Sequence, residues 1–159
     1  MALVVNLQRK LKLDSKSFTE FSAQLSASID GIADADFSVA FISDRRMKEL
    51  NAFFRGKTMT TDVLSFPHEA DEFEGKSYAF THGNDDKLTP EEKIPTFLGD
   101  IVISVEQAQR QAEENDLTLE TEIKQLILHG LLHLCGFDHE TDDGEMNKRE
   151  LQLRRKLKI

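Results

Sequence analysis

The sequence predicts a single α/β domain of the α+β type, in which a small mixed sheet of about four strands is packed with helices. Three observations lead to this fold class. The chain has 159 residues, which suits one domain spanning 1–159. Short β-branched or aromatic runs alternate with segments of helical periodicity. One helical segment is apolar nearly all round, which is typical of a central buried helix.

The first half of the chain supplies three predicted strands and two predicted helices. The strands are the short apolar runs at 3–7, 37–42 and 63–66. Ser43 or Asp44 can cap the second helix. Apolar residues recur at helical intervals in both helices: Phe18, Phe21, Leu25 and Ile29, then Met47, Leu50 and Phe54.

The second half contributes one more strand and three helices. The strand covers 97–103, and Ser104 with Gln107 forms a capping box for a helix at 105–114. A closing helix is expected from about Asp142 to the end of the chain, because apolar residues recur there at helical spacing. These residues are Met146, Leu153 and Leu157.

The helix predicted at 119–134 is the central one. Its main apolar stripe is formed by Leu119, Ile123, Leu126, Ile127, Leu131 and Leu134. Leu128 and Leu132 lie almost opposite that stripe, so this half of the helix is buried on most sides. His129 and His133 fall at the border of the stripe, where a rigid helix can present ligands to a cleft.

Three of the five histidines lie in one stretch with the spacing H-x3-H-x5-H. His129 and His133 are four residues apart and therefore share one face of a helix. Gly136 is suited to end the helix, so that the chain can fold back and bring His139 to the same point. Three protein nitrogens and one open position are typical of a catalytic zinc site.

Two alternative interpretations apply to these histidines. They can be hydrogen-bonded core residues, but three at ligand spacing favour a metal. They also match the spacing of the metzincin proteases, in which a general-base glutamate follows the first histidine. Gly130 stands at that position, which disfavours a protease. Cys135 lies off the shared face and is interpreted as a small apolar residue.

Charge neither demands nor excludes RNA as a partner. The net charge is −9, but a polar segment at 68–95, with eight acidic and three basic residues, has a net charge of −5 and is interpreted as an acidic loop. Elsewhere basic residues outweigh Asp44 and Glu49 by three charges: Arg45, Arg46, Lys48, Arg55 and Lys57. A positive groove on an acidic protein is therefore possible.

The composition also favours one cellular compartment. A single cysteine cannot form an internal disulfide, so a reducing cytoplasm is the expected location. The apolar start of the chain is too short for a secretory signal, and no stretch reaches membrane-spanning length. No membrane association is expected.

The stretch from His129 to His139 resembles the H-G-x-x-H-L-x-G-x-D-H signature of the YbeY family, the single-domain endoribonucleases also called rRNA maturation factors. Two further blocks are similar to the family and occur in its order. The first runs from 50–55 to 61–66, and the second covers 98–104. The resemblance extends over essentially the whole chain, and its main departure is the length and acidity of segment 68–95.

The resemblance implies a metal-dependent hydrolase that cleaves single-stranded RNA in rRNA maturation and ribosome quality control. It implies that zinc is held by His129, His133 and His139, with His129 also catalytic. The family's functional arginine corresponds to Arg55. RNA, and the ribosome or ribosomal proteins, are the implied partners, and no specificity for DNA is implied.

The histidines and Arg55 together suggest a mechanism. A divalent ion would acidify a water or polarise a phosphoryl oxygen, and Arg55 would bind the scissile phosphate. Asp138 and Asp100 are candidates to orient a histidine from outside the ligand set. A metalloprotease-like hydrolase, or a ribosome-assembly protein with a structural metal, remain the alternative functions.

Overall fold

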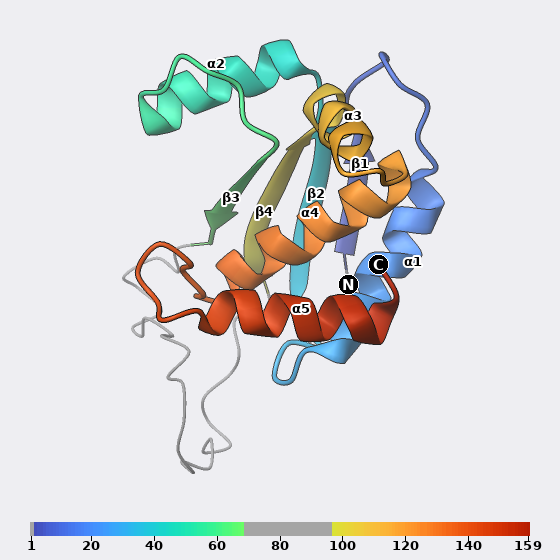
Figure 1. The fold of residues 1–159 in the computed structure, drawn as a ribbon, viewed down its shortest axis with the longest axis vertical. Helices are drawn as coiled ribbons and strands as arrows, with labels where there is room; N and C mark the ends of the chain where they lie inside the picture. The colour runs from blue at the N-terminus through green and yellow to red at the C-terminus, as the bar shows by residue number, and fades with distance from the viewer. Residues whose placement is uncertain (1, 69–96) are drawn as a thin grey trace.

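A four-stranded sheet and the helices packed on it make up the part of the chain that the structure describes, residues 2–68 and 97–159 of a computed structural model (Figure 1). The strands are β1 (Ala2–Asn6), β2 (Asp36–Ile42), β3 (Val63–Pro67) and β4 (Phe97–Ser104). The helices are α1 (Ser15–Ser28), α2 (Asp44–Arg55), α3 (Val105–Glu114), α4 (Leu119–Leu134) and α5 (Glu145–Leu157). The acidic loop predicted at 68–95 lies outside the described residues, apart from His68.

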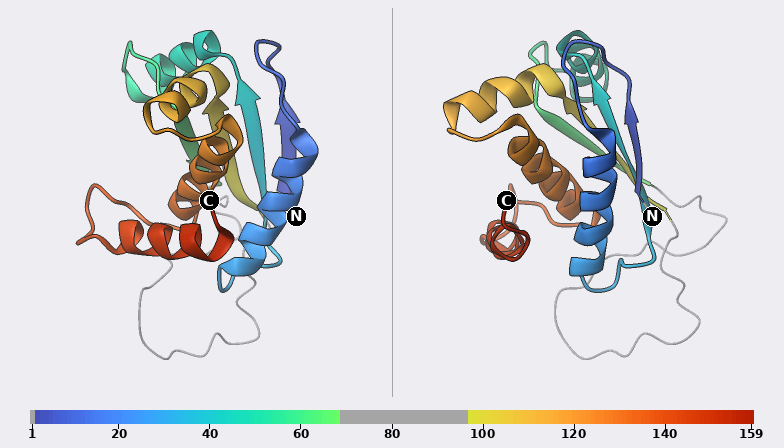
Figure 2. Two further views of the ribbon diagram at one scale, coloured as in Figure 1. Left: turned by 45° about the vertical axis from the view of Figure 1, so that its right-hand side comes forward. Right: turned by 90° about the vertical axis from the view of Figure 1, so that its right-hand side faces the viewer.

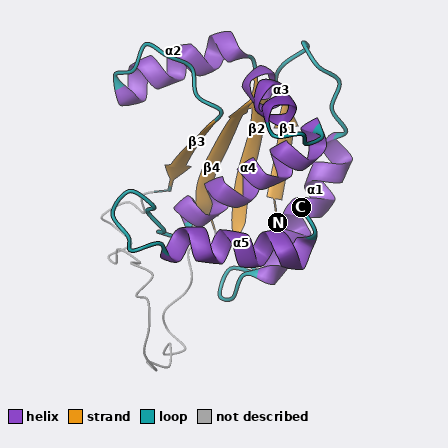
Figure 3. Cartoon of the chain, in the orientation of Figure 1, coloured by secondary structure: helices purple, strands orange, loops and turns teal. Residues whose placement is uncertain are grey.

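The sheet is mixed, as the sequence predicted. Its strand order is β1-β2-β4-β3. β1 pairs with β2 and β2 with β4 in parallel, whereas the edge strand β3 runs antiparallel to β4. The fold class predicted from the sequence is therefore confirmed (Figure 3).

The two faces of the sheet bury different helices (Figure 2). Because side chains alternate along a strand, Ile101 and Ile103 of β4 join the main core with α1 and α4, while Val102 points the other way. On that second face Val102 packs in a smaller cluster with Met47 of α2 and Leu64 of β3. α2 is therefore separated by the sheet from α4.

α4 is the buried centre of the larger core. It has apolar side chains without solvent exposure on several sides, namely Ile123, Ile127, Leu128, Leu131 and Leu132. Thr118 caps its first turn by accepting a hydrogen bond from the amide of Thr121. α5 packs across its outer side (Figure 1). The predicted bounds of this helix agree with the structure.

The predicted helix at 105–114 is confirmed, but its capping box and the predicted start of the closing helix need correction. The Ser104 hydroxyl accepts from the amide of Gln107, but the side chain of Gln107 accepts from Arg110 instead of completing the capping box. The closing helix begins at Glu145 and not near Asp142. The Asp142 carboxylate accepts from the amides of Gly144 and Met146, which makes a turn before the helix.

No helix in residues 2–68 and 97–159 combines the length and the apolar character needed to cross a bilayer.

Gly130 sets how closely α4 approaches the sheet. A Cβ atom added there would lie 2.8 Å from Cγ2 of Ile101 and 3.2 Å from two further atoms of that side chain. The carbonyl oxygen of Gly130 also accepts a hydrogen bond from Ser65 of β3 at 3.3 Å. Glycine at position 130 therefore allows close contact between the central helix and both β3 and β4.

We expect Gly130→Val to lower the free energy of unfolding by about 1–3 kcal/mol, because the added side chain overpacks the contact with Ile101. Urea unfolding followed by circular dichroism measures this change. In the double variant with Ile101→Ala, the smaller side chain leaves room for valine and should restore part of the lost stability. The changes in the free energy of unfolding should therefore not be additive. A Gly130→Val variant as stable as the parent would contradict this packing.

Candidate metal centre

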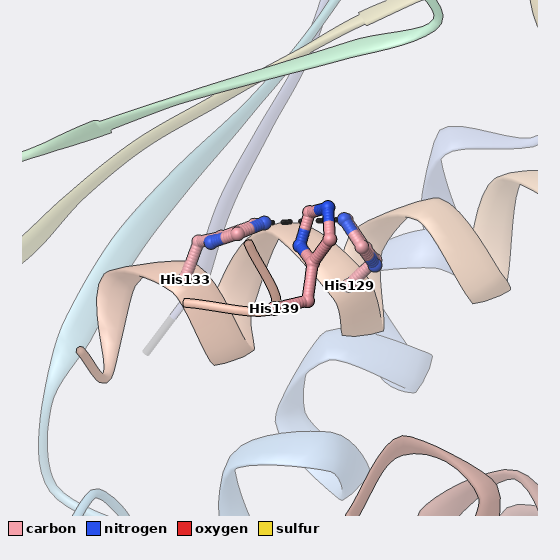
Figure 4. A group of neighbouring side chains, drawn as sticks. All are labelled: His129, His133 and His139. Carbon is pink, nitrogen blue, oxygen red and sulfur yellow. Dashed lines mark hydrogen bonds between the residues drawn. The ribbon is translucent and has the colours of Figure 1, made fainter. Parts of the chain in front are cut away.

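Three histidines meet at the C-terminal end of α4 (Figure 4). His129 and His133 project from the helix, and His139 faces them from the turn that follows. One ring nitrogen of each lies within 4.8 Å of the others. The ring centroids are 4.8 to 5.3 Å apart. The structure thus brings together the three residues that the sequence singled out.

The return of the chain to His139 depends on the end of α4. Gly136 has a φ of 91° and follows the last helical turn in the left-handed conformation. Its amide donates to the carbonyl oxygen of His133, and the amide of Phe137 donates to that of Leu132. These two bonds form a Schellman motif, which explains why glycine is suited to position 136.

The histidine rings on α4 are oriented by oxygen acceptors. Nδ1 of His133 lies 2.9 Å from the carbonyl oxygen of Phe137, and Nδ1 of His129 lies 3.1 Å from the carboxylate of Glu150. Since a carbonyl and an ionised carboxylate only accept, Nδ1 carries the proton in both rings. Each Nε2 then presents a lone pair.

The spacing of these lone pairs fits a metal ion. The two Nε2 atoms are 3.2 Å apart, shown as a dashed line in Figure 4. Two nitrogens on one tetrahedral zinc, each at about 2.05 Å, lie about 3.3 Å apart. Two lone pairs in such proximity repel unless a cation or a shared proton lies between them. The histidine group can therefore hold a divalent ion.

Burial favours the neutral form of His133. It lowers the pKa of this histidine, and the neighbouring imidazole of His129 acts in the same direction. A neutral imidazole is the form that binds metals. Cys135, directly after the helix, is buried, and burial raises the pKa of its thiol to about 12. It is not part of the ligand group, in agreement with its interpretation as an apolar residue.

Glu150 was missed by the sequence analysis. It lies on α5, is 7% exposed, and its carboxylate contacts both His129 and Arg154. Burial alone would raise the pKa of Glu150, but the hydrogen bond from His129 and the interactions with Arg154 together hold it below its ordinary value. A signal was present, because Glu150 shares the buried face of α5 with Met146 and Leu153. A carboxylate on a buried face needs a partner.

The histidines open into a cleft of about 680 Å³. One wall is β3 with the segment that leads into it, and the opposite wall is the turn after α4. Arg55, at the end of α2, and Lys57 line the same cleft. The two cations and the three histidines therefore face one shared space.

The two aspartates predicted to orient a histidine lie elsewhere or bind other groups. Asp100 is on β4, where its carboxylate accepts a hydrogen bond from Ser38, and it does not line the cleft. Asp138 lines the cleft, but its carboxylate accepts from the amide of Glu140 and the hydroxyl of Thr141. These bonds make it a turn former. Glu150 and the carbonyl of Phe137 occupy the orienting positions instead.

Position 130 is also informative about the protease alternative. The Cα–Cβ direction there leads into Ile101 of the sheet and not into the cleft. A general base following the first histidine would need space that β4 already fills. The site therefore lacks both the residue and the room for the metzincin arrangement.

Comparison with known proteins agrees with this geometry. The family model described as Endoribonuclease YbeY matches residues 4–158. A protein of Nautilia profundicola named Endoribonuclease YbeY is 40% identical over 129 residues, which cover 80% of this chain and 76% of that protein. Another of the same name from Aquifex aeolicus is 38% identical over 151 residues, covering 94% and 85%.

A solved structure has a similar fold. The solution structure of a Thermotoga maritima protein aligns with a TM-score of 0.59 and 25% sequence identity. The alignment covers 99% of this chain and 89% of that one. With the match of the family model over nearly the whole sequence, these similarities show that the chain belongs to the YbeY endoribonuclease family.

Proposed function

We propose that this protein is a metal-dependent endoribonuclease that hydrolyses phosphodiester bonds of single-stranded RNA in the histidine cleft. One observation carries the proposal: three convergent imidazoles share a cleft with Arg55 and Lys57. Family membership supports RNA as the substrate class, since the relatives are named endoribonucleases. We further propose that residues 1–159 act as a single hydrolase domain.

The resident ion in this proposal is zinc, held by His129, His133 and His139. When bound, it supplies Lewis-acid polarisation of a phosphoryl oxygen and lowers the pKa of a bound water. The residues of the chain prepare for it by accepting from Nδ1 of both α4 rings, which leaves Nε2 of each ring directed at the other. Three nitrogen ligands are typical of a zinc site with one position free for substrate.

Arg55 is proposed to bind the scissile phosphate. Its guanidinium can donate to two phosphoryl oxygens at once and offset the charge that develops on them. Lys57 adds a second positive charge in the same cleft. Both side chains belong to exposed residues, so that an entering RNA strand can reach them.

Glu150 is proposed as a positioning residue for His129. Its carboxylate fixes the proton on Nδ1 and turns Nε2 toward the other two histidines. Arg154, one helical turn further on, donates to the other carboxylate oxygen and holds Glu150 in place. The carboxylate–histidine pair thus links α5 to the metal centre.

The proposed biological setting follows the family resemblance. We propose that the substrate is ribosomal RNA, that the ribosome or its proteins are partners, and that the enzyme acts in rRNA maturation and ribosome quality control in the cytoplasm. A ribosome-assembly protein with a structural metal is the second candidate function, because an ion held between α4 and the turn after it can also stabilise the fold. Turnover separates the two, since a stoichiometric binder generates no new RNA ends.

Replacement of His129 and of Arg55 should have different effects. We expect His129→Ala to lower the metal content measured by mass spectrometry, because it removes a ligand. Arg55→Ala should retain the metal but lower kcat/KM for single-stranded RNA by about 10²- to 10³-fold, the usual effect of losing one charge-stabilising group. Arg9→Ala, at an exposed site beyond β1, is the matched control. Normal RNA cleavage by both site variants would refute the mechanism.

Replacement of Glu150 tests the orientation of His129. We expect Glu150→Ala to weaken zinc binding by about 10- to 100-fold in competition with a chromogenic chelator. Glu150→Gln keeps an oxygen acceptor for Nδ1 of His129, so its loss of zinc affinity should be smaller. Nitrogen-15 NMR of the metal-free protein should show the Nδ1-protonated form of His129 in the parent and a mixture of tautomers in Glu150→Ala. The exposed control Glu114→Gln should behave like the parent. If the zinc affinity and the tautomer of His129 are both unchanged in Glu150→Ala, Glu150 does not position His129.

Metal removal distinguishes the candidate functions. The metal-loaded protein should produce new ends in single-stranded RNA with multiple turnovers and leave casein intact. A chelator should abolish RNA cleavage, and zinc in slight excess should restore it. RNA binding without new ends would favour the assembly protein, and cleavage of casein would favour the protease.

A further inference from the structure

Large apolar side chains are exposed at the end of α2 and just beyond it. Phe53 is 81% exposed, Phe54 57% and Met59 75%. We refer to these three residues as the α2 platform. They are close in sequence, and exposed apolar side chains that gather in one place are a common mark of a binding surface.

The rings of the α2 platform are held in a fixed arrangement. Phe54 contacts Phe66 of β3 edge to face, with ring centroids 4.9 Å apart. Phe53 in turn contacts Phe54 at 4.8 Å with an interplanar angle of 77°. Phe54 is thus anchored to the sheet, whereas Phe53 is the most exposed large apolar residue within 2–68 and 97–159.

The surroundings of the α2 platform are positively charged. Residues 44–57 contain five basic and two acidic side chains, in a chain whose net charge is −9. Both acids are engaged, because Asp44 pairs with Arg110 and Glu49 with Arg45. The other basic residues have no carboxylate within ion-pair distance in the described part of the chain: Arg46, Lys48, Arg55 and Lys57. The surface therefore suits a polyanion.

A short stretch of chain joins the α2 platform to residues that line the cleft. Arg55 directly follows Phe54, and Gly56, with a φ of 63°, ends the helix in the left-handed conformation. The chain then passes through Lys57 to Met59 and on into β3. Arg55 and Lys57 line the histidine cleft, so an RNA strand that passes round the edge strand β3 can reach both the cleft and the platform.

We propose that the α2 platform stacks unpaired bases of an RNA strand whose scissile phosphate lies in the histidine cleft. This inference rests on the proposed function and names a subsite for it. Every base has a π-face, so an aromatic ring beside basic residues binds single strands with little sequence preference. Phe, Met and Arg are enriched in protein interfaces as well, but Lys is depleted there, and Lys48 and Lys57, unpaired within the described residues, favour a polyanion. Here basic residues precede and follow the rings along the chain.

The test compares RNA affinities and asks whether the effect of replacing Phe53 requires the bases of the RNA. The full-length, metal-loaded protein is mixed with a labelled single-stranded RNA of about 12 nucleotides. Binding is read by stopped-flow anisotropy before turnover, and again with chelator present. A matched abasic oligomer keeps the phosphates but offers nothing to stack.

We expect Phe53→Ala to weaken binding of the normal RNA roughly tenfold and to leave binding of the abasic oligomer unchanged. Phe53→Trp should bind at least as well as the parent. Phe53→Leu should resemble Phe53→Ala, since it retains apolar area without a ring. Leu3→Ala, which removes a side chain 64% exposed on β1 at the opposite edge of the sheet, is the control and should have no effect.

The outcomes separate this inference from the proposed function. If the parent neither binds nor cleaves RNA, both fail. If the parent binds and cleaves but Phe53→Ala binds RNA equally well, the endoribonuclease proposal stands and the stacking platform is overturned. Parent-like binding by Phe53→Leu would also overturn stacking, and would point to apolar docking of a protein. Thermal unfolding of each variant verifies that exposed substitutions leave the fold intact.

Discussion

The burial of α4 between the sheet and α5 is the constraint on which the rest of the molecule depends. Its apolar residues face β4 and α1 on one side, and the contact is close because Gly130 has no Cβ to separate the helix from Ile101. A helix fixed in this way is a rigid base for side chains. His129 and His133 emerge at its partly buried border, and their positions follow from how the helix packs.

Besides that rigid helix, the candidate metal centre depends on three local features. The Schellman motif at Gly136 returns the chain so that His139 approaches the helix. It also brings the carbonyl of Phe137 to His133, so one turn contributes both a histidine and an orienting acceptor. α5 contributes the other acceptor through Glu150. α2 lies across the sheet, yet its end supplies Arg55 to the same cleft.

Much of the fold and the histidine group could be predicted from the sequence because their causes are local. Apolar periodicity defines α4, and histidine spacing defines a shared helix face. The orienting carboxylate could not be placed, because Glu150 meets His129 only when α5 folds across α4, 21 residues along the chain. Asp100 was misjudged for the same reason, since its partner Ser38 is 62 residues away on β2. Strand order likewise depends on long-range pairing that a single sequence does not encode in any local pattern.

X-ray absorption spectroscopy of the zinc-loaded protein measures the ligand set directly. Three imidazoles should appear as nitrogen scatterers at about 2.0–2.1 Å with the outer-shell pattern of histidine rings, and with one further light atom completing a four-coordinate ion. A sulfur shell at about 2.3 Å, which would implicate Cys135, or a signal from fewer than three imidazoles, would contradict the proposed centre.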